Sequence, residues 1–342
     1  MGEAFRPRVG VWSPDVRLLA VAGWLAALGF ALTSRGLVGG RPATALPGEP
    51  RPVAAAIARR AQEAETTMRQ AEDLLRQAKV RAGVSDDPEA GPDASGLIGS
   101  ELTPLVTTLG SLEAKRTAAN PAWARVLTER LAGAGIGRGD LVAAGFSGSF
   151  PGLNVAVMAA CRALGADVAA VSSVTASTWG ADQPGFTWPE MEARLVEARI
   201  VPRASIALTA GGEADSALDL EPGDRAVAMA TLEGAARRLD VPALHPSSFE
   251  EAVRQRLVCY RRASNGRPIA LYVNVGGSSA SLGRSPGILR MRSGFLPPGP
   301  FDRSRDGGVT ARFASDRVKV LMLLNIRDLA LRWGVPLAGR FP

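Results

Sequence analysis

Histidine and cysteine are almost absent from this 342-residue chain, which contains one histidine and two cysteines. A single histidine, His245, excludes multi-histidine metal sites and leaves only one imidazole for any serine-histidine mechanism. Cys161 and Cys259 are too few for a disulfide framework, and their spacing fits no metal-ligand pattern. One bridge and two free thiols are both open. The sequence also lacks a Walker loop, a zinc pair and a dinucleotide fingerprint, so we expect no metal and no cofactor.

Aromatic residues and lysines are also scarce, and the positive charge is unevenly placed. The net charge is +7, and residues 281–342 account for all of it, with eleven Arg and Lys against four Asp. A basic carboxyl-terminal portion suits an anionic polymer or lipid headgroups. The alternative is an arginine-rich composition with no partner. Few aromatics lie among these arginines, which argues against a single-strand nucleic-acid platform, and no nucleic-acid partner is expected.

The only long apolar run lies near the amino end. Residues 18–33 are uncharged and are expected to form a short membrane span. We expect a cytoplasmic tail at 1–17 and a transmembrane signal anchor at 18–35, with most of the chain outside the cytoplasmic membrane. A cleaved signal peptide is the alternative, with a small-residue site at 43–45.

Residues 36–96 are expected to form a linker and a juxtamembrane helix. Within 52–82, apolar residues alternate four and three positions apart, which is a heptad-like stripe. Because most of the stripe is alanine, a coiled-coil stalk would be weak, and packing against the body of the protein or a membrane partner is equally open. Residues 83–96 are expected to form a loop that ends this helix.

From about residue 120, short apolar runs alternate with amphipathic segments, which is the pattern of an α/β fold. Strands are expected at 140–146, 167–173, 205–209 and 269–275. Helices are expected at 120–135, 151–165, 188–199, 225–239, 248–263 and 314–333. A strand, a helix and a strand of these lengths make a right-handed crossover, so the strands should be parallel. The expected fold is an open, mostly parallel sheet flanked by helices, within an α/β ligand-binding domain at 97–342.

Each expected strand ends in small polar residues or glycine. In open parallel sheets the carboxyl ends of the strands share one edge, where ligands bind. Four loops rich in backbone N–H groups and hydroxyls would line one site there, suited to a carboxylate or phosphate. The alternative is that each cluster only turns the chain. The candidate ligand-binding residues are Ser147, Gly148, Ser149, Ser172, Ser173, Gly211, Gly212, Asn274, Gly276, Gly277 and Ser278, together with Lys115 and Arg116.

Ser147 is the candidate catalytic residue. It lies in "GFSGS", a partial match to the G-x-S-x-G nucleophile elbow in which Ser149 replaces the last glycine. Its base would have to be His245 or a lysine such as Lys115, which stands beside Arg116. The alternative for Lys115 is a solvated helix charge.

Four runs resemble the poly-gamma-glutamate system protein family, and together they span roughly residues 97–285. They are "TPLVTTLGSLEAKRTAANP", "GFSGSFPGLNVAVMAACRALG", "SSVTASTWGADQPGFTWPEME" and "NVGGSSASLG". Members of that family are bacterial proteins encoded beside membrane-bound poly-gamma-glutamate synthase components. The resemblance implies a membrane-tethered accessory to making, exporting or trimming an anionic polymer of glutamate. It implies no catalytic residues.

Three functions are therefore open. The leading one is a membrane-anchored accessory protein of poly-gamma-glutamate synthesis or export, which works with the synthase components and binds glutamate-like or polymer carboxylates. A rival is a serine-dependent amidase or transpeptidase-like enzyme that uses Ser147 or Ser149, with strand-end amides as an oxyanion hole. The third is a scaffold for the synthase, built on the anchor and the alanine stripe.

Overall fold

The structure is a computed structural model, and it describes residues 55–285, 287, 291–297 and 307–338. The expected tail at 1–17 and anchor at 18–35 lie outside these residues. Among the helices that are described, none has the length and hydrophobicity needed to cross a bilayer. All described residues belong to one compact unit, which runs from Leu46 to Pro342.

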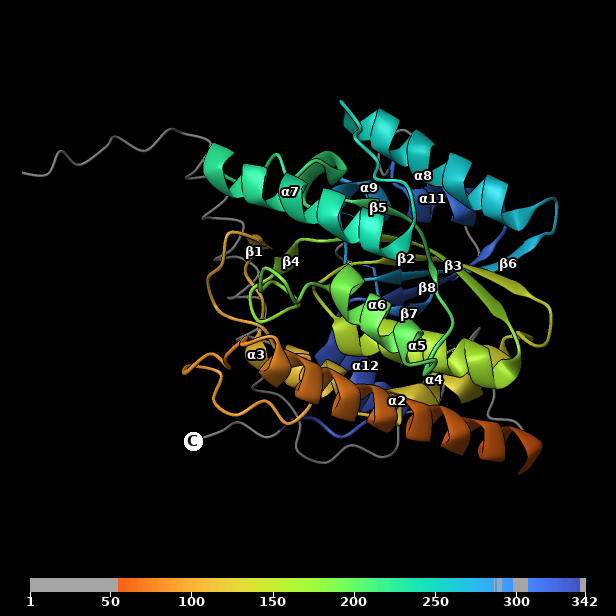
Figure 1. The fold of residues 1–342 in the computed structure, drawn as a ribbon. Coiled ribbons are helices and arrows are strands. Elements are labelled where there is room, and N and C mark those ends of the chain that lie inside the picture. The colour runs from red at the N-terminus through yellow and green to blue at the C-terminus, as the bar shows by residue number, and fades with distance from the viewer. Residues whose placement is uncertain (1–54, 286, 288–290, 298–306, 339–342) are drawn as a thin grey trace, which may run out of the picture. The chain divides into compact units, whose positions relative to one another are not determined.

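A six-stranded sheet forms the centre of the described part of the chain (Figure 1). Its strands lie in the order β5 (Ser205–Thr209), β3 (Asp167–Ser173), β2 (Leu141–Phe146), β6 (Ile269–Val275), β8 (Lys319–Leu323) and β7 (Gly294–Phe295). The first five strands are parallel, and β7 runs antiparallel to β8. The expected α/β class with a mostly parallel sheet is therefore confirmed. A second, two-stranded parallel sheet pairs β1 (Val106–Thr108) with β4 (Ala176–Ser177).

Helices cover both faces of the large sheet (Figure 1). One face is covered by α4 (Ala122–Gly133), α5 (Pro151–Leu164), α6 (Trp188–Glu197) and α12 (Ile326–Trp333), and α2 (Ala55–Arg81) packs on the outer side of α4 and α5. The other face is covered by α8 (Phe249–Ser264), α9 (Ser279–Leu282) and α11 (Val309–Ser315). The helix α7 (Pro222–Leu239) packs beside β5, α3 (Leu112–Ala118) precedes α4, and the short 3₁₀ helix η1 (Glu213–Asp215) follows β5.

The four expected strands are confirmed, three of them at their predicted residues. The helix expected over 314–333 is wrong, because α11 ends at Ser315 and α12 begins only at Ile326. Between them, β8 pairs with β6 and is buried over all but its first residue. A strand buried on both faces is apolar throughout, so its sequence lacks the alternation that separates a strand from a buried helix.

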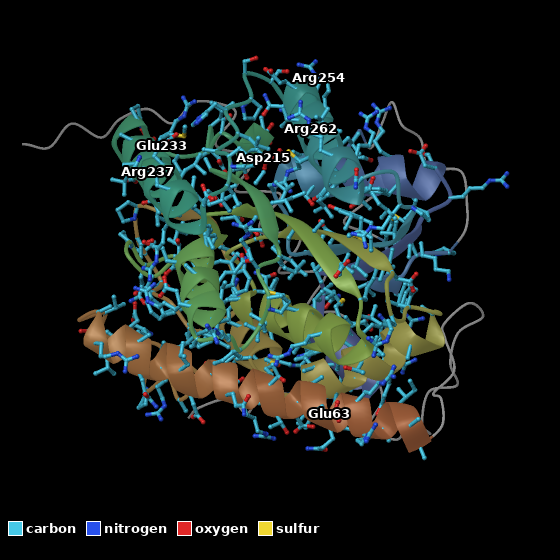
Figure 2. The ribbon with its side chains drawn as sticks, turned by 45° about the vertical axis from the view of Figure 1, so that its right-hand side comes forward. Glu63, Asp215, Glu233, Arg237, Arg254 and Arg262 are labelled. Carbon is cyan, nitrogen blue, oxygen red and sulfur yellow. The ribbon has the colours of Figure 1, made fainter. Side chains whose placement is uncertain are left out.

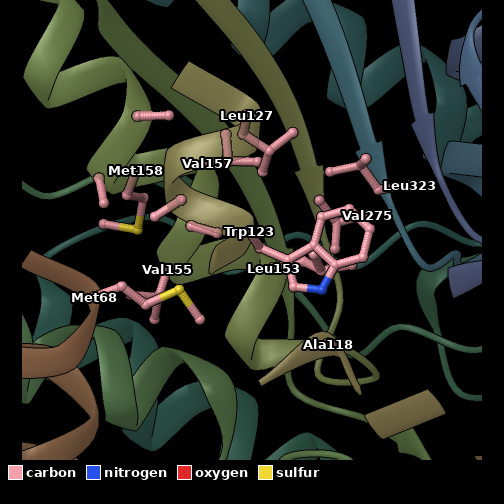
Figure 3. Packing of buried hydrophobic residues seen from close by; sticks show 14 of the residues in the cluster. Met68, Ala118, Trp123, Leu127, Leu153, Val155, Val157, Met158, Val275 and Leu323 are labelled. Carbon is pink, nitrogen blue, oxygen red and sulfur yellow. The ribbon is translucent and has the colours of Figure 1, made fainter. Parts of the chain in front are cut away.

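The apolar stripe of α2 packs against the body of the protein itself. Ala64, Met68, Ala71 and Leu75 are completely buried and share one core with α4 and α5. Figure 3 shows the Met68 side chain beside Val155 of α5. Small alanine side chains allow the three helices to approach closely, which accounts for an alanine-rich stripe without a coiled-coil partner.

Met68→Ala should therefore destabilise the protein. Removing a fully buried methionine side chain costs about 2–5 kcal/mol in transfer and cavity energy. The neighbouring exposed Thr66→Ala is the control and should change stability by no more than about 0.5 kcal/mol. Urea unfolding of both variants measures the difference. Equal stabilities would mean that α2 does not pack on α4 and α5.

Candidate functional site

The strand order reverses between β2 and β6. The chain proceeds from β2 through β3 to β5 in one direction, and β6 and β8 lie on the other side of β2. The loops that follow β2 and β6 therefore leave the carboxyl edge in opposite directions, which is the usual position of a ligand crevice in an open α/β sheet. Three of the predicted residues, Ser147, Ser149 and Gly276, come together at this switch point. A Cβ placed on Gly276 would lie 2.4 Å from Ser147 Oγ and 3.3 Å from Ser149 Cβ.

A buried lysine lies beside the switch point. Lys115 of α3 is only 3% exposed, and its Nζ donates to the carbonyl oxygen of Ser149 at 2.5 Å. The same Nζ donates to Ser177 Oγ at 2.5 Å and lies 4.3 Å from the ring centroid of Phe150. No carboxylate of the described residues lies within 4 Å of Nζ, as an ion pair would require. Lys115 is therefore not a solvated helix charge.

Burial strongly shifts the protonation of Lys115 and of a nearby aspartate. Desolvation lowers the pKa of Lys115 to about 7, and attraction to Asp182 partly opposes that shift. Desolvation also raises the pKa of Asp182 to about 7, against a backbone N–H from Ser100 and the attraction of Lys115. The second oxygen of Asp182, Oδ2, is buried and has no hydrogen-bond partner among the described residues. Two groups that titrate near neutral pH at one edge of a sheet indicate a functional site.

Ser147 lies at the switch point, although neither expected base contacts it. Its Oγ donates to the carbonyl oxygen of Val275 at 3.1 Å, and the amide of Asn154 donates to its carbonyl oxygen. His245 Nε2 instead lies 2.9 Å from Glu233 Oε1. His245 follows Ala243, which pairs with β5, and β3 separates β5 from β2. Lys115 contacts Ser149 and Ser177 rather than the Ser147 hydroxyl.

The other end of this edge is organised by a buried ion pair. Arg256 of α8 donates from Nε to Asp215 Oδ2 at 2.5 Å and from Nη2 to Oδ1 at 2.8 Å. Arg256 also donates to Thr209 and Ser278, so one guanidinium joins the loops that follow β5 and β6. Burial alone would lower the pKa of Arg256, but pairing with Asp215 raises it. The pair is both charged and hydrogen-bonded, as a stable buried ion pair must be.

Backbone strain collects in the same loops. Of the non-glycine residues with positive φ in the described chain, Arg199, Asp240, Asn265 and Arg317 end helices, where this conformation is ordinary. The others lie after β4 and β5, and they are Trp179, Ala214, Asp215 and Ala217. A tryptophan or alanine in this conformation is strained, and such strain is typical of ligand sites.

Two further candidates, Ser172 and Asn274, are completely buried. Ser172 belongs to a buried network with Ser205 and Trp188 on the α6 side of the sheet. Asn274 is completely buried, accepts from Ser281 and donates to the carbonyl oxygen of Gly276. These two residues therefore stabilise the sheet and its loops from inside.

The glycines at this edge allow loops to touch. A Cβ on Gly148 would lie 2.8 Å from the carbonyl oxygen of Thr175, and a Cβ on Gly211 would lie 2.8 Å from the Cβ of Ser173. Gly212 packs similarly against Asp219. Gly277 is exposed, and Ser278 caps α9.

Arg116 of α3 donates to the carbonyl oxygen of Ala90. Both cysteines are free thiols, Cys161 completely buried and Cys259 half-buried. Burial raises the pKa of Cys161 to about 12, which makes it an inert core thiol. Within the described ranges, His, Cys, Asp and Glu form no group of three that could hold a metal ion.

Sequence reasoning missed Ser177, Asp182, Asp215 and Arg256 as site residues. Arg256 had a visible signal, since it occupies the buried stripe of α8 between Val253 and Tyr260. A charged residue in an apolar stripe indicates a buried partner. Ser177 and Asp182 carry no such signal, because Ser177 lies on the two-residue strand β4 and Asp182 lies in the irregular chain after it.

A hollow of about 330 Å³ lies elsewhere, between α8 and α11. It is lined by Glu250, Arg254, Tyr260, Ile269 and Arg312, among others. Since Ile269 is the first residue of β6, this hollow lies at the amino ends of the strands. It is therefore separate from the Lys115 site.

The chain matches no protein-family model, and no curated protein matches it. A solved structure of 2-hydroxyisobutyryl-CoA ligase in the postadenylation state, in complex with R3-HIB-AMP, aligns at 17% identity. The alignment covers 73% of this chain and 50% of the ligase, with a TM-score of 0.15. The chain thus spans about half the length of that ligase, and a likeness this slight carries no functional argument.

Asp215→Asn should destabilise the protein strongly. The variant leaves the Arg256 guanidinium buried beside a neutral amide, and breaking a buried pair costs about 3–5 kcal/mol. Figure 2 labels Asp215 together with Arg254, an exposed arginine of α8 that serves as the control. Arg254→Gln should change stability by no more than about 0.5 kcal/mol. A loss of under 1 kcal/mol in Asp215→Asn, measured by urea unfolding, would contradict the ion pair.

Lys115→Met should change how stability depends on pH. The pKa of Lys115 is about 7 in the folded protein and 10.5 when unfolded, so the unfolded state binds more protons between these values. Wild type should therefore gain stability relative to Lys115→Met as the pH rises from 7 to 10. At pH 6 the methionine variant should be at least as stable as wild type, because it buries no charge. Thermal unfolding across this range provides the measurement, and parallel curves would show that Lys115 titrates normally.

Proposed function

We propose that the α/β domain binds carboxylate groups of a glutamate-like polymer at the edge formed by Lys115, Ser149 and Ser177. In this proposal the protein is an accessory of poly-gamma-glutamate synthesis or export, tethered to the cytoplasmic membrane and acting with the synthase components. One observation carries the binding site: Lys115 is buried at the switch point without a carboxylate of the described chain in ion-pair contact.

An unpaired buried amine favours an anionic ligand. A carboxylate that reached Nζ would supply the missing counter-charge and restore the protonated amine, and charge-assisted hydrogen bonds of this kind are strong. The helix α5 begins at Pro151, next to this site, and directs its positive end toward the same edge. Both features favour the charged carboxylate over a neutral ligand.

Two basic residues of the carboxyl-terminal portion extend the edge on either side. Arg327 of α12 pairs with Glu113 of α3, and Arg284, which follows α9, pairs with Glu213 in the loop after β5. Both arginine side chains are partly exposed, at 43% and 47%. A polymer with a carboxylate on every residue could exchange with Glu113 or Glu213 for these partly exposed guanidinium groups, in addition to the single site at Lys115.

The polymer and the membrane tether rest on the sequence. The runs that resemble the poly-gamma-glutamate system family include Lys115, Ser149 and Ser177, and the apolar run at 18–33 supplies the expected anchor. The proposal therefore combines a site argued from geometry with a context argued from resemblance.

Lys115→Met should weaken binding of poly-gamma-glutamate about tenfold or more, because one charge-assisted hydrogen bond is worth about 1.5–3 kcal/mol. Wild-type binding should be tighter at pH 6 than at pH 9, since only the protonated amine attracts the carboxylate and its pKa is about 7. Titration calorimetry with a short gamma-glutamyl oligomer measures both effects.

The matched control is Lys319→Met, which removes an exposed lysine of the basic carboxyl-terminal portion. It should leave the affinity for the short oligomer within about twofold, the scale of a screened surface charge. Equal losses in the two variants, or binding that is independent of pH, would show that the oligomer is held by general positive charge.

A further inference from the structure

We propose that Ser177 and Lys115 form a nucleophile–base pair that cleaves or transfers an amide or ester bond. This activity goes beyond carboxylate binding, and it places the nucleophile at a serine for which the elbow motif gives no signal. The proposal stands on the contact between the two side chains, the burial of the amine and the position of the pair at the carboxyl edge.

The contact has the geometry that a serine-lysine mechanism requires. Lys115 Nζ lies 2.5 Å from Ser177 Oγ, although the residues are 62 positions apart in the chain. Nζ donates to the carbonyl oxygen of Ser149 and to Ser177 Oγ. Once the amine is neutral, its lone pair can accept the proton of the Ser177 hydroxyl while an N–H keeps the bond to Ser149. The hydroxyl of Ser149 also accepts from the backbone N–H of Ser177 at 3.1 Å. Ser149 therefore orients both members of the pair, which is the third role in an activated-nucleophile arrangement.

The environment makes the lysine a usable base. A general base works best when its pKa lies near the working pH, and burial lowers that of Lys115 to about 7. Asp182 is the charged neighbour that sets this balance, because it attracts the ammonium form and so prevents a larger decrease. The Phe150 ring, 4.3 Å from Nζ, also favours the ammonium form that results from proton transfer.

Ser177 suits the role of nucleophile better than the two serines of the elbow motif. The Ser147 hydroxyl donates to the carbonyl oxygen of Val275, and no base of the described chain contacts it. Ser149 offers its carbonyl oxygen to Lys115, whereas its hydroxyl accepts from Ser177. Only Ser177 presents its hydroxyl oxygen to the amine.

An exposed glycine, Gly110, lies next to the pair. A Cβ on Gly110 would lie 3.1 Å from Lys115 Cε and 3.1 Å from Ser177 Oγ. Glycine at this position therefore leaves the space above the nucleophile open, while Ser177 itself is 7% exposed. A substrate would enter along β1 and the residues that follow it.

The reaction follows from these positions. Neutral Lys115 takes the proton of the Ser177 hydroxyl as Oγ forms a bond to the carbonyl carbon of the substrate. The carbon–nitrogen bond of the amide then breaks, and the Lys115 ammonium gives its proton to the departing nitrogen. Water attacks the resulting ester on Ser177, Lys115 takes a proton from that water, and the serine oxygen leaves and regains its proton. An amine in place of water would give transfer instead of hydrolysis.

The test uses the full-length protein with a fluorophosphonate probe and a p-nitrophenyl ester. Peptide mass spectrometry should locate the label on Ser177, and ester cleavage should rise with pH through about 7 as Lys115 loses its proton. Ser177→Ala and Lys115→Arg should each lower the rate by about 100-fold or more, the scale of general-base catalysis. Lys115→Arg retains the positive charge but cannot act as a base, which separates catalysis from charge.

Ser247→Ala, at an exposed serine just before α8, is the control variant and should keep both labelling and the pH profile. Circular dichroism checks that every variant is folded, and the binding assay with the gamma-glutamyl oligomer is repeated on Ser177→Ala. Lost turnover with most of the binding affinity kept, because the variant retains Lys115, supports the pair and separates this activity from the proposed binding function. A label on Ser147, no label at all, or a rate independent of Lys115 would overturn the proposal, whether or not the oligomer binds.

Discussion

The site depends on one electrostatic constraint, the burial of the Lys115 amine without a carboxylate of the described chain in ion-pair contact. Burial of a protonated amine without an ion-pair partner is energetically unfavourable, so burial lowers the pKa of Lys115. The amine then either attracts an external anion or acts as a base. Ser149 and Ser177 supply the hydrogen bonds that keep it folded inward in both cases.

A second buried cation on the same edge, Arg256, has a carboxylate as its ion-pair partner. Arg256 is fully paired with Asp215 and bonded to residues of the two adjacent loops, so it organises structure and needs no ligand. The contrast distinguishes a structural charge from a functional one. The ion pair offsets the backbone strain in the loop around Asp215. At the other end of the edge, the buried amine of Lys115 has no such ion-pair contact with a described residue.

The sequence predicted the sheet better than it predicted the site. The four predicted strands are apolar runs followed by small polar residues or glycine, so their positions and their common edge can be predicted directly. The segment of β8 fits a buried helix as well as a strand, because it is apolar after its first residue, Lys319. Ser177 lies on β4, a strand of two residues that pairs with the three-residue β1. Strands this short carry no periodic signal, and the contact they create between α3 and β4 depends on tertiary packing alone. Lys115 stands out in the sequence because the chain has only three lysines, but the sequence does not show that its side chain is buried.

The most direct measurement is the pKa of Lys115 itself, followed by nuclear magnetic resonance of labelled lysine side chains. The chain has only three lysines, Lys79, Lys115 and Lys319, so the signals can be assigned by substitution. The account predicts one signal that titrates near pH 7, disappears in Lys115→Met and moves to higher pH when a gamma-glutamyl oligomer is added. A Lys115 signal that titrates near the ordinary lysine value of 10.5 would contradict the account.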